Sequence, residues 1–108
     1  MTTEQHRKML ECAAKACGYE ILDWYGERYT AHDGEKLIAF NPLTNPADTA
    51  EMCAKLDINH MWMDGYIKCW QWKKPPVRIE HNGTDEDKKA AWRLAASIVA
   101  AKIGGYSE

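Results

Sequence analysis

The sequence lacks any long apolar run. No uninterrupted apolar stretch in its 108 residues approaches the ~18 residues of a membrane-spanning helix or the roughly 7–15 residues of a signal-peptide core. After Met1, the first residues, 2–6, are polar. We therefore expect no membrane partner and a cytoplasmic location.

The sequence also lacks every motif that would indicate a catalytic, metal or cofactor site. It has no C-x-x-C, no H-x-x-x-H, no nucleophile elbow and no glycine-rich phosphate loop. Cys12 and Cys17 are five positions apart, ~140° around a helix, so they cannot hold one ion together. The four histidines fall on four different expected elements: His6, His32, His60 and His81. We expect no cofactor, no metal and four reduced, buried thiols. Of the histidines, we expect only His60 to be interior. An enzyme would require a pocket that joins His60 to a carboxylate.

The sequence also has almost no excess of charge of either sign. Fourteen basic and sixteen acidic side chains give a formal net charge of -2, so no overall field would attract duplex DNA or an anionic membrane. The apolar content of 45% is that of a globular chain, and the length is that of one domain, residues 1–108.

Three helices are predicted from capping residues and apolar periodicity. Each begins after a residue whose side chain accepts hydrogen bonds from the first turn, and each N-cap is followed by an acidic or amide side chain near the helix start. The expected N-caps are Thr2, Asn45 and Thr84, and the expected ends are Gly18, Leu56 and Gly104–Gly105.

The strongest strand signal is a hairpin. Residues 58–63 and 66–72 are rich in β-formers and flank Asp64-Gly65, a dipeptide that favours a type I′ turn with Met63 opposite Tyr66. A second hairpin is expected around Asp33-Gly34. The other expected strands are 19–24, 28–31, 37–40 and 77–80.

Both faces of the 58–72 hairpin are substantially apolar. Ile58 and Ile67 fall on one face, and Met61 and Trp70 fall on the other. A sheet with apolar residues on both faces is typical of one covered on both sides. We therefore predict an α+β (α/β) fold, a three-layer α-β-α sandwich with a mostly antiparallel sheet of about four to six short strands and three helices.

Three segments carry a family resemblance: the first helix ending at Gly18-Tyr19, residues 40–45 (Phe-Asn-Pro-Leu-Thr-Asn) leading into a helix that closes on Lys55-Leu56, and residues 90–95. In these segments the chain resembles the phage ABA sandwich domain family, small proteins of tailed phages and prophages. The resemblance implies an α–β–α fold and a phage origin, and it carries over no catalytic residue. The family has a glycine where this chain has Asp57, which leaves the end of the second helix in question.

Aromatic and basic residues alternate along strand 66–74. Aromatics interleaved with cations on a strand face are typical of proteins that stack single-stranded nucleic acid or a nucleotide and neutralise its phosphates. The same rings could instead pack beneath a helix, with the lysines pointing to solvent, or form a surface for a protein partner. The candidate residues are Lys68, Trp70, Trp72, Lys73, Lys74 and Arg78.

A second group of aromatics, Trp24, Tyr25 and Tyr29, lies in the least regular part of the sequence. Exposed tryptophan and tyrosine mark interaction surfaces more often than active sites. Together with the resemblance, this predicts a phage accessory protein of the host cytoplasm that binds a host or phage protein and antagonises a defence or regulatory protein. The alternative is a protein that binds or sequesters a nucleotide or single-stranded nucleic acid, and a homodimer is compatible with both hypotheses.

Overall fold

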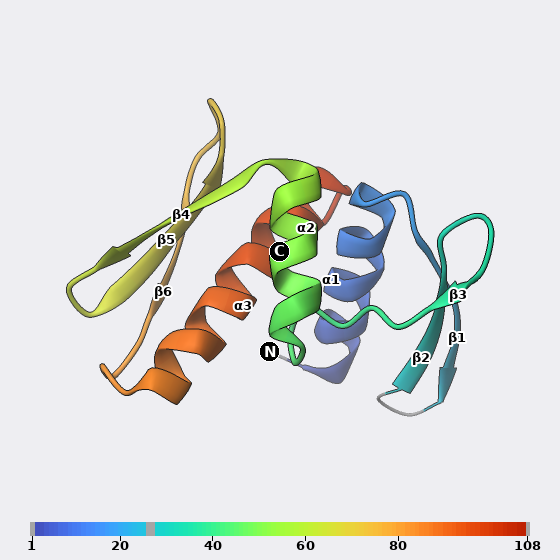
Figure 1. Cartoon of the computed structure of the whole chain (residues 1–108), viewed down its shortest axis with the longest axis horizontal. Coiled ribbons are helices and arrows are strands. Elements are labelled where there is room, and N and C mark those ends of the chain that lie inside the picture. The colour runs from blue at the N-terminus through green and yellow to red at the C-terminus, as the bar shows by residue number, and fades with distance from the viewer. Residues whose placement is uncertain (1, 26–27, 108) are drawn as a thin grey trace.

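The computed structural model describes residues 2–25 and 28–107, apart from the side chains of Tyr25 and Arg28. Within this part of the chain, three helices alternate with two groups of strands, so the predicted α+β class is confirmed (Figure 1). The elements in chain order are α1 (Thr3–Ala16), β1 (Glu20–Tyr25), β2 (Arg28–His32), β3 (Leu37–Ile38), α2 (Pro46–Leu56), β4 (Ile58–Met63), β5 (Tyr66–Gln71), β6 (Val77–Glu80) and α3 (Asp85–Ile103).

The helices begin at the predicted caps. Thr2 and Gln5 form a capping box, in which the Gln5 backbone N–H donates to Thr2 Oγ1 at 3.1 Å and the Thr2 N–H donates to Gln5 Oε1 at 2.8 Å. The side chains of Asn45 and Thr84 accept backbone N–H groups at the starts of α2 and α3. These caps satisfy donors that have no partner within the helix, which explains why local sequence located the helix starts.

The strands form two separate three-stranded antiparallel sheets, ordered β1-β2-β3 and β4-β5-β6. In the first sheet, β1 has an irregular register between Ile21 and Asp23, and β3 is only two residues long. The predicted hairpin around Asp33-Gly34 joins β2 to β3, with Ala31 paired to Ile38. Neither sheet has the four to six strands that were predicted for one sheet.

The second sheet contains the predicted hairpin with the predicted register. Met63 pairs with Tyr66 across Asp64-Gly65. The predicted type I′ turn is wrong, because that turn needs a positive φ at both central residues and only Gly65 of the two has one, at 81°. A glycine takes this conformation without the steric penalty that a Cβ imposes on Asp64.

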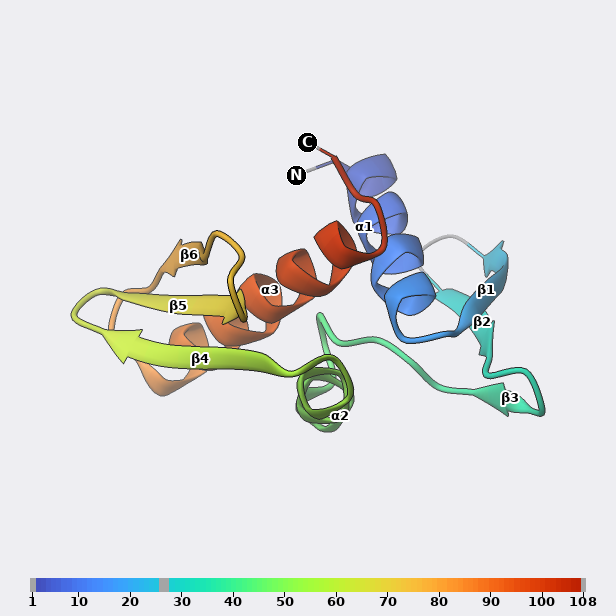
Figure 2. The ribbon, with the colours of Figure 1, turned by 90° about the horizontal axis from the view of Figure 1, so that it is seen from above.

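The helices lie between the two sheets. In Figure 1 and Figure 2, α1 and α2 pack on one side of α3, the β4-β5-β6 sheet packs on its other side, and the β1-β2-β3 sheet lies beyond α1. The predicted sheet with helices on both faces is therefore not what the structure has. No helix of the described chain is both long and apolar enough to cross a membrane.

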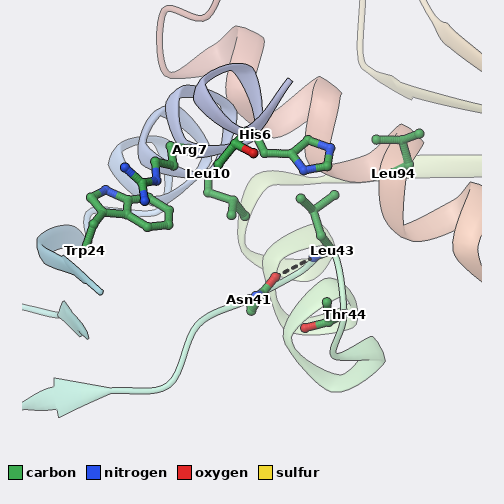
Figure 3. A pocket seen from close by; sticks show the side chains of 9 residues that line it. His6, Arg7, Leu10, Trp24, Asn41, Leu43, Thr44 and Leu94 are labelled. Atoms are coloured by element: carbon green, nitrogen blue, oxygen red, sulfur yellow. Dashed lines mark hydrogen bonds between the residues drawn. The ribbon is translucent and has the colours of Figure 1, made fainter. Parts of the chain in front are cut away.

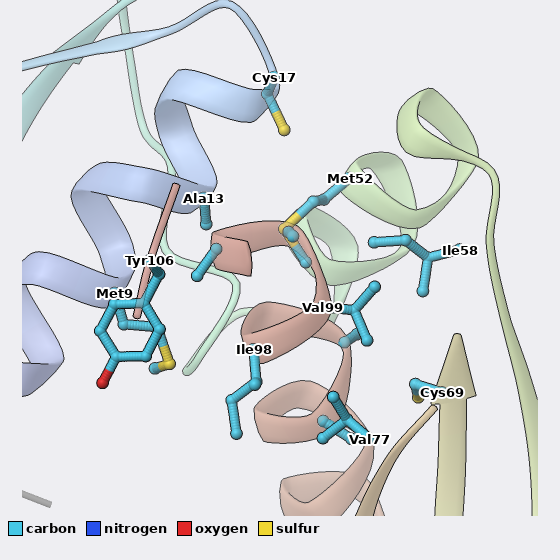
Figure 4. Close-up of a cluster of buried hydrophobic side chains, with 14 of the residues drawn as sticks. Met9, Ala13, Cys17, Met52, Ile58, Cys69, Val77, Ile98, Val99 and Tyr106 are labelled. Carbon is cyan, nitrogen blue, oxygen red and sulfur yellow. The ribbon is translucent and has the colours of Figure 1, made fainter. Parts of the chain in front are cut away.

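The C-terminal half of α3 is the centre of the molecule. Every residue from Ala95 to Ala101 is buried, which is typical of a helix packed on several sides rather than of one with a solvent face. Its neighbours include Met9 of α1, Met52 of α2 and Cys69 of β5 (Figure 4). The helical layer, not a sheet, is thus the middle of the fold.

The layering was mispredicted because apolar residues on the outer strand face were assumed to be covered. Met61 and Met63 are 48% and 37% exposed, and Trp72, just beyond β5, is 74% exposed. Much of any protein surface is apolar, so an apolar strand face does not by itself require a second layer.

Candidate binding surface on the second sheet

The structure separates the predicted site residues into two groups. Trp24 and Tyr29 belong to the first sheet, and the side chain of Tyr25 lies outside the described residues. The other six belong to the second sheet and the turn that follows β5, at the opposite end of the molecule (Figure 1): Lys68, Trp70, Trp72, Lys73, Lys74 and Arg78. The two groups cannot form one site.

The central strand β5 gives the second sheet two different faces. Ile67 and Cys69 point inward and are fully buried against α3. Tyr66, Lys68 and Trp70 alternate with them, so they lie on the outer face, and each is only half-buried. We call this side of β4, β5 and β6 the outer face.

The neighbouring strands extend the outer face on both sides of β5. From β4, Met61 lies opposite Lys68. From β6, Arg78 lies opposite Lys68, and Glu80 lies opposite Tyr66. Directly opposite side chains in an antiparallel pair are ~5 Å apart at Cβ, so aromatic, thioether and cationic groups are contiguous here.

Two cation–π contacts lie on the outer face. Lys68 Nζ is 5.4 Å from the centroid of the Trp70 ring, and Arg78 Cζ is 5.8 Å from that of Tyr66. These distances are within the range in which a ring face attracts a cation. The contacts place positive charge beside each half-buried ring on the outer side of β5.

A strained turn continues the outer face beyond β5. The backbone N–H of Lys74 donates to the Gln71 carbonyl at 3.0 Å, and this closes a turn with Trp72 and Lys73 in the middle. Lys73 has a φ of 62°, a left-handed conformation that costs free energy for any residue other than glycine. The turn holds the exposed Trp72 ring next to two lysines.

His60, which was expected to be interior, is exposed on β4. On the inner side of the sheet its ring centroid is 6.2 Å from Trp62 and 6.1 Å from Trp92. Trp62 in turn has Lys88 Nζ 5.0 Å from its centroid. This aromatic group joins β4 to the start of α3, and it lies on the side away from the outer face.

Trp24 and Tyr29 attach the first sheet to the helices rather than project into solvent. Both are half-buried, and their ring centroids are 4.6 Å apart. Trp24 Nε1 donates to Glu11 Oε1 of α1 at 2.7 Å, and the Tyr29 hydroxyl donates to the Phe40 carbonyl. Burial raises the pKa of the Tyr29 hydroxyl, so it stays protonated as a donor. Trp24 and Tyr29 are therefore only partly accessible, and their predicted role in an interaction surface stays a prediction.

The cysteines are free, and three are unreactive by environment. Burial raises the pKa of the Cys17 and Cys53 thiols from 9.0 to about 11 and that of Cys69 to about 12. Thiols with such values carry almost no thiolate near neutral pH. Cys12 and Cys53 are only half-buried, so the prediction of four buried thiols is wrong in part. In the part of the chain that the structure describes, no three histidine, cysteine or acidic side chains are arranged as ligands for one metal ion.

Comparison with known proteins finds no match: no family model, no curated protein and no solved structure is similar to the chain. The resemblance to the phage ABA sandwich domain family stays a prediction from sequence.

Proposed function

We propose that this chain is a small phage or prophage accessory protein of the host cytoplasm that binds single-stranded nucleic acid through the outer face. The observation that carries the proposal is the row of Tyr66, Lys68 and Trp70 along a central strand. Within the described residues, the helices lie on the other side of this sheet (Figure 1). Arg78 stands beside this row on β6.

Stacking on Tyr66 and Trp70 supplies the affinity in this proposal. An unpaired base that stacks on an aromatic side chain contributes ~1–3 kcal/mol, and the contact accepts any base. The two rings are four residues apart on one strand, ~13 Å at 3.3 Å per residue. One nucleotide cannot reach both rings, so an oligonucleotide should bind more tightly than a mononucleotide.

The cations beside the rings supply phosphate contacts. Lys68 and Arg78 lie on the outer face, and Lys73 and Lys74 follow at its end. This local excess of positive charge is compatible with a net charge of -2 for the whole chain. Half-exposed rings on a strand face suit unstacked bases, whereas a duplex keeps its bases paired and stacked.

The competing target is a host or phage protein. Met61, Met63 and Trp72 form an exposed apolar set that also suits a protein interface. The alternation of rings with cations favours nucleic acid, because the central part of a protein interface is usually depleted of charged side chains.

Fluorescence anisotropy with labelled single strands of roughly 10–16 nucleotides tests the proposal, since that length covers a single-domain site. Trp70→Leu should weaken binding by ~1–3 kcal/mol. Trp62→Leu is the matched control, because the same ring is removed from the inner face of the same sheet. No binding by the unsubstituted chain, or an equal loss in the two variants, would show that the outer face does not bind nucleic acid.

Salt dependence tests the phosphate contacts separately. Each phosphate neutralised on a single strand contributes ~0.7 to the slope of log affinity against log salt concentration. Lys68→Gln should therefore reduce the slope by ~0.7. Lys15→Gln, exposed in the last turn of α1 and remote from the second sheet, is the control and should leave the slope unchanged. Equal slopes for all three proteins would contradict a role for Lys68.

A further inference from the structure

Two features outside the outer face are candidates for a further contact: a hollow beside α1 and the free edge of β4. In the hollow, Asn41 Oδ1 accepts the Leu43 N–H at 3.2 Å, and Arg7 stacks on the Trp24 ring (Figure 3). Trp24 in turn donates to Glu11 of α1. These polar side chains already have partners within the chain, so they are not available to a ligand.

The backbone along the free edge of β4, by contrast, has no partner in the described chain. β4 pairs with β5 on one side only, and Figure 2 shows it along the border of the second sheet. No turn or loop of the described residues bonds to its backbone from the other side. Five of its six residues are exposed, among them Met61, Trp62 and Met63. Unpaired N–H and C=O groups along such an edge are a template for another strand.

The other three sheet edges have features that block the addition of a strand. β6 follows Pro75-Pro76 and contains Arg78 and Glu80. β1 contains two acidic residues and has an irregular register, and β3 is only two residues long. Proline, charge, irregular register and short length all disfavour pairing between edges. β4 has none of these features, since its sequence is Ile-Asn-His-Met-Trp-Met. The contrast indicates that this edge is made for pairing.

The alternation of backbone groups determines which β4 residues face the free edge. In an antiparallel strand, successive residues point their N–H and C=O groups to opposite sides. The Gly65 carbonyl accepts the His81 N–H from the β6 side at 3.0 Å, so the next residue, Tyr66, faces β4 and its partner Met63. Every second residue back from Met63 likewise points at β5. The residues between them point their groups to the free edge: Ile58, His60 and Trp62.

The register of a two-fold pair follows from this alternation. Only residues that face the free edge can bond across the axis, so a pairing near the middle of the strand joins His60 to His60 or to Trp62 of the second copy. The first register would place Met63 opposite Asp57, the C-cap of α2, where β4 has not yet begun. The second keeps both strands of the pair within β4, and it places Met61 opposite Met61.

The side chains of β4 are complementary to themselves in this second register. Met61 meets its own copy on the outer face, and His60 lies opposite Trp62 on the inner face, with Cβ atoms ~5 Å apart. None of residues 59–63 is charged, so the two-fold axis places no like charges opposite each other. A charged strand would repel its own copy in the same arrangement.

We propose that the chain forms a symmetric dimer in which β4 pairs antiparallel with β4 of a second copy, with Met61 opposite Met61. The two three-stranded sheets then form one six-stranded sheet, and the two outer faces are continuous. The dimer goes beyond the proposed function and does not depend on it.

Disulfide cross-linking of the whole chain tests the register. In Met61→Cys the two introduced thiols lie in a pair without hydrogen bonds, with Cα atoms ~4.5 Å apart, which a disulfide can bridge. Met63→Cys is the matched control on the same face, because its two thiols would lie ~13 Å apart along the strands, beyond the reach of a disulfide. In a glutathione redox buffer, Met61→Cys should give a covalent dimer, whereas Met63→Cys and the unsubstituted chain should stay monomeric on a non-reducing gel.

Sedimentation equilibrium tests the reversible dimer. The unsubstituted chain should show a monomer–dimer equilibrium. Met61→Glu should raise the dissociation constant about fivefold or more, because the two introduced carboxylates face each other across the axis. Each of them still lies opposite Lys68 within its own sheet, which favours folding of the variant. Met63→Glu is the control and should have a smaller effect, since its carboxylate would lie opposite Asn59 of the second copy.

Three results would each overturn the β4 dimer. The first is an unsubstituted chain that stays monomeric up to about 1 mM, which would leave the edge to a strand of a different protein. The second is equal cross-linking of Met61→Cys and Met63→Cys, and the third is a dimer that Met61→Glu does not weaken. If Met61→Glu does not fold, the two cysteine variants decide the question.

Discussion

Two residues other than glycine adopt a left-handed backbone in the described chain, and they have different consequences. Asp57 ends α2 with φ 54° and ψ 44°, the cap geometry that glycine usually supplies. The sequence left this helix end in question because Asp57 replaces the glycine of the resembling family. The chain forms the left-handed cap with an aspartate, at a cost in backbone strain.

Asp57→Gly should therefore stabilise the fold. The expected gain is up to ~1 kcal/mol, because glycine has no Cβ clash in this conformation but loses more backbone entropy on folding. Urea denaturation measures it. Asp64→Gly is the control, since Asp64 has no positive φ and its substitution should give no gain. An equal effect in both variants would contradict strain at Asp57.

Lys73 is the second left-handed residue, and it lies beside the outer face. Lys73→Gly should raise the free energy of unfolding by ~0.5–1 kcal/mol and at the same time weaken oligonucleotide binding, since it relieves strain and removes a cation. Denaturation and anisotropy on the same protein samples measure both effects. If the variant is more stable but binds the oligonucleotide with unchanged affinity, Lys73 has no role in binding.

The buried thiols should make the free energy of unfolding fall as pH rises in the alkaline range. The pKa of Cys69 rises from 9.0 to about 12 on burial, so the folded state keeps a proton that the unfolded chain loses. The stabilisation is complete below pH 9, and it is lost as pH rises toward the folded pKa. Denaturation midpoints of the native chain should fall more steeply between pH 9 and 11 than those of Cys69→Ala. If the midpoints of the two proteins fall in parallel with pH, the Cys69 thiol does not contribute to this dependence.

At the scale of elements, α1 approaches the end of α3 so closely that one added methyl group would disturb the contact. A Cβ at Gly104 would lie 1.8 Å from the Cys12 carbonyl oxygen, a distance that the backbone of α1 cannot accommodate without moving. Gly104→Ala should destabilise the fold by ~2–4 kcal/mol through overpacking and helix displacement.

Gly105→Ala is the matched control for that contact. Nothing lies within 4 Å of a Cβ built at Gly105, although its φ of 98° strains any side chain. Its cost should be limited to ~1–2 kcal/mol of backbone strain. If urea denaturation gives Gly105→Ala the larger loss, the packing of α1 on α3 is not as described.

Elements were predictable wherever their determinants are local. Thr2, Asn45 and Thr84 fixed the helix starts through side-chain bonds to the next turn, and Asp64-Gly65 fixed the hairpin register. The turn type failed because only Gly65 of that pair takes a positive φ. Boundaries in the first sheet were less accurate, since β3 is two residues long and contributes little pattern.

At the scale of the whole molecule, the division of six strands into two sheets could not be read from local pattern. Which strands pair depends on contacts between distant segments, such as α1 with α3. One signal did exist: the run from Ala95 to Ala101 has no charged residue on any side, which indicates a central helix.

The two groups of candidate residues lie in different parts of the fold. The residues predicted along strand 66–74 lie together on the second sheet and the turn after β5, whereas Trp24 and Tyr29, from the second predicted group of aromatics, lie on the first sheet (Figure 2). Met61 was assigned to a covered face and instead belongs to the outer face.

The most direct test of binding at the outer face is an NMR titration of the whole chain with a short single-stranded oligonucleotide. Binding there predicts saturable shifts of backbone amides in β5 and the turn after it, and of the Trp70 and Trp72 indole N–H signals, with the Trp24 indole unchanged. Shifts confined to α1 and the first sheet, or none at concentrations that saturate other single-strand-binding domains, would contradict it.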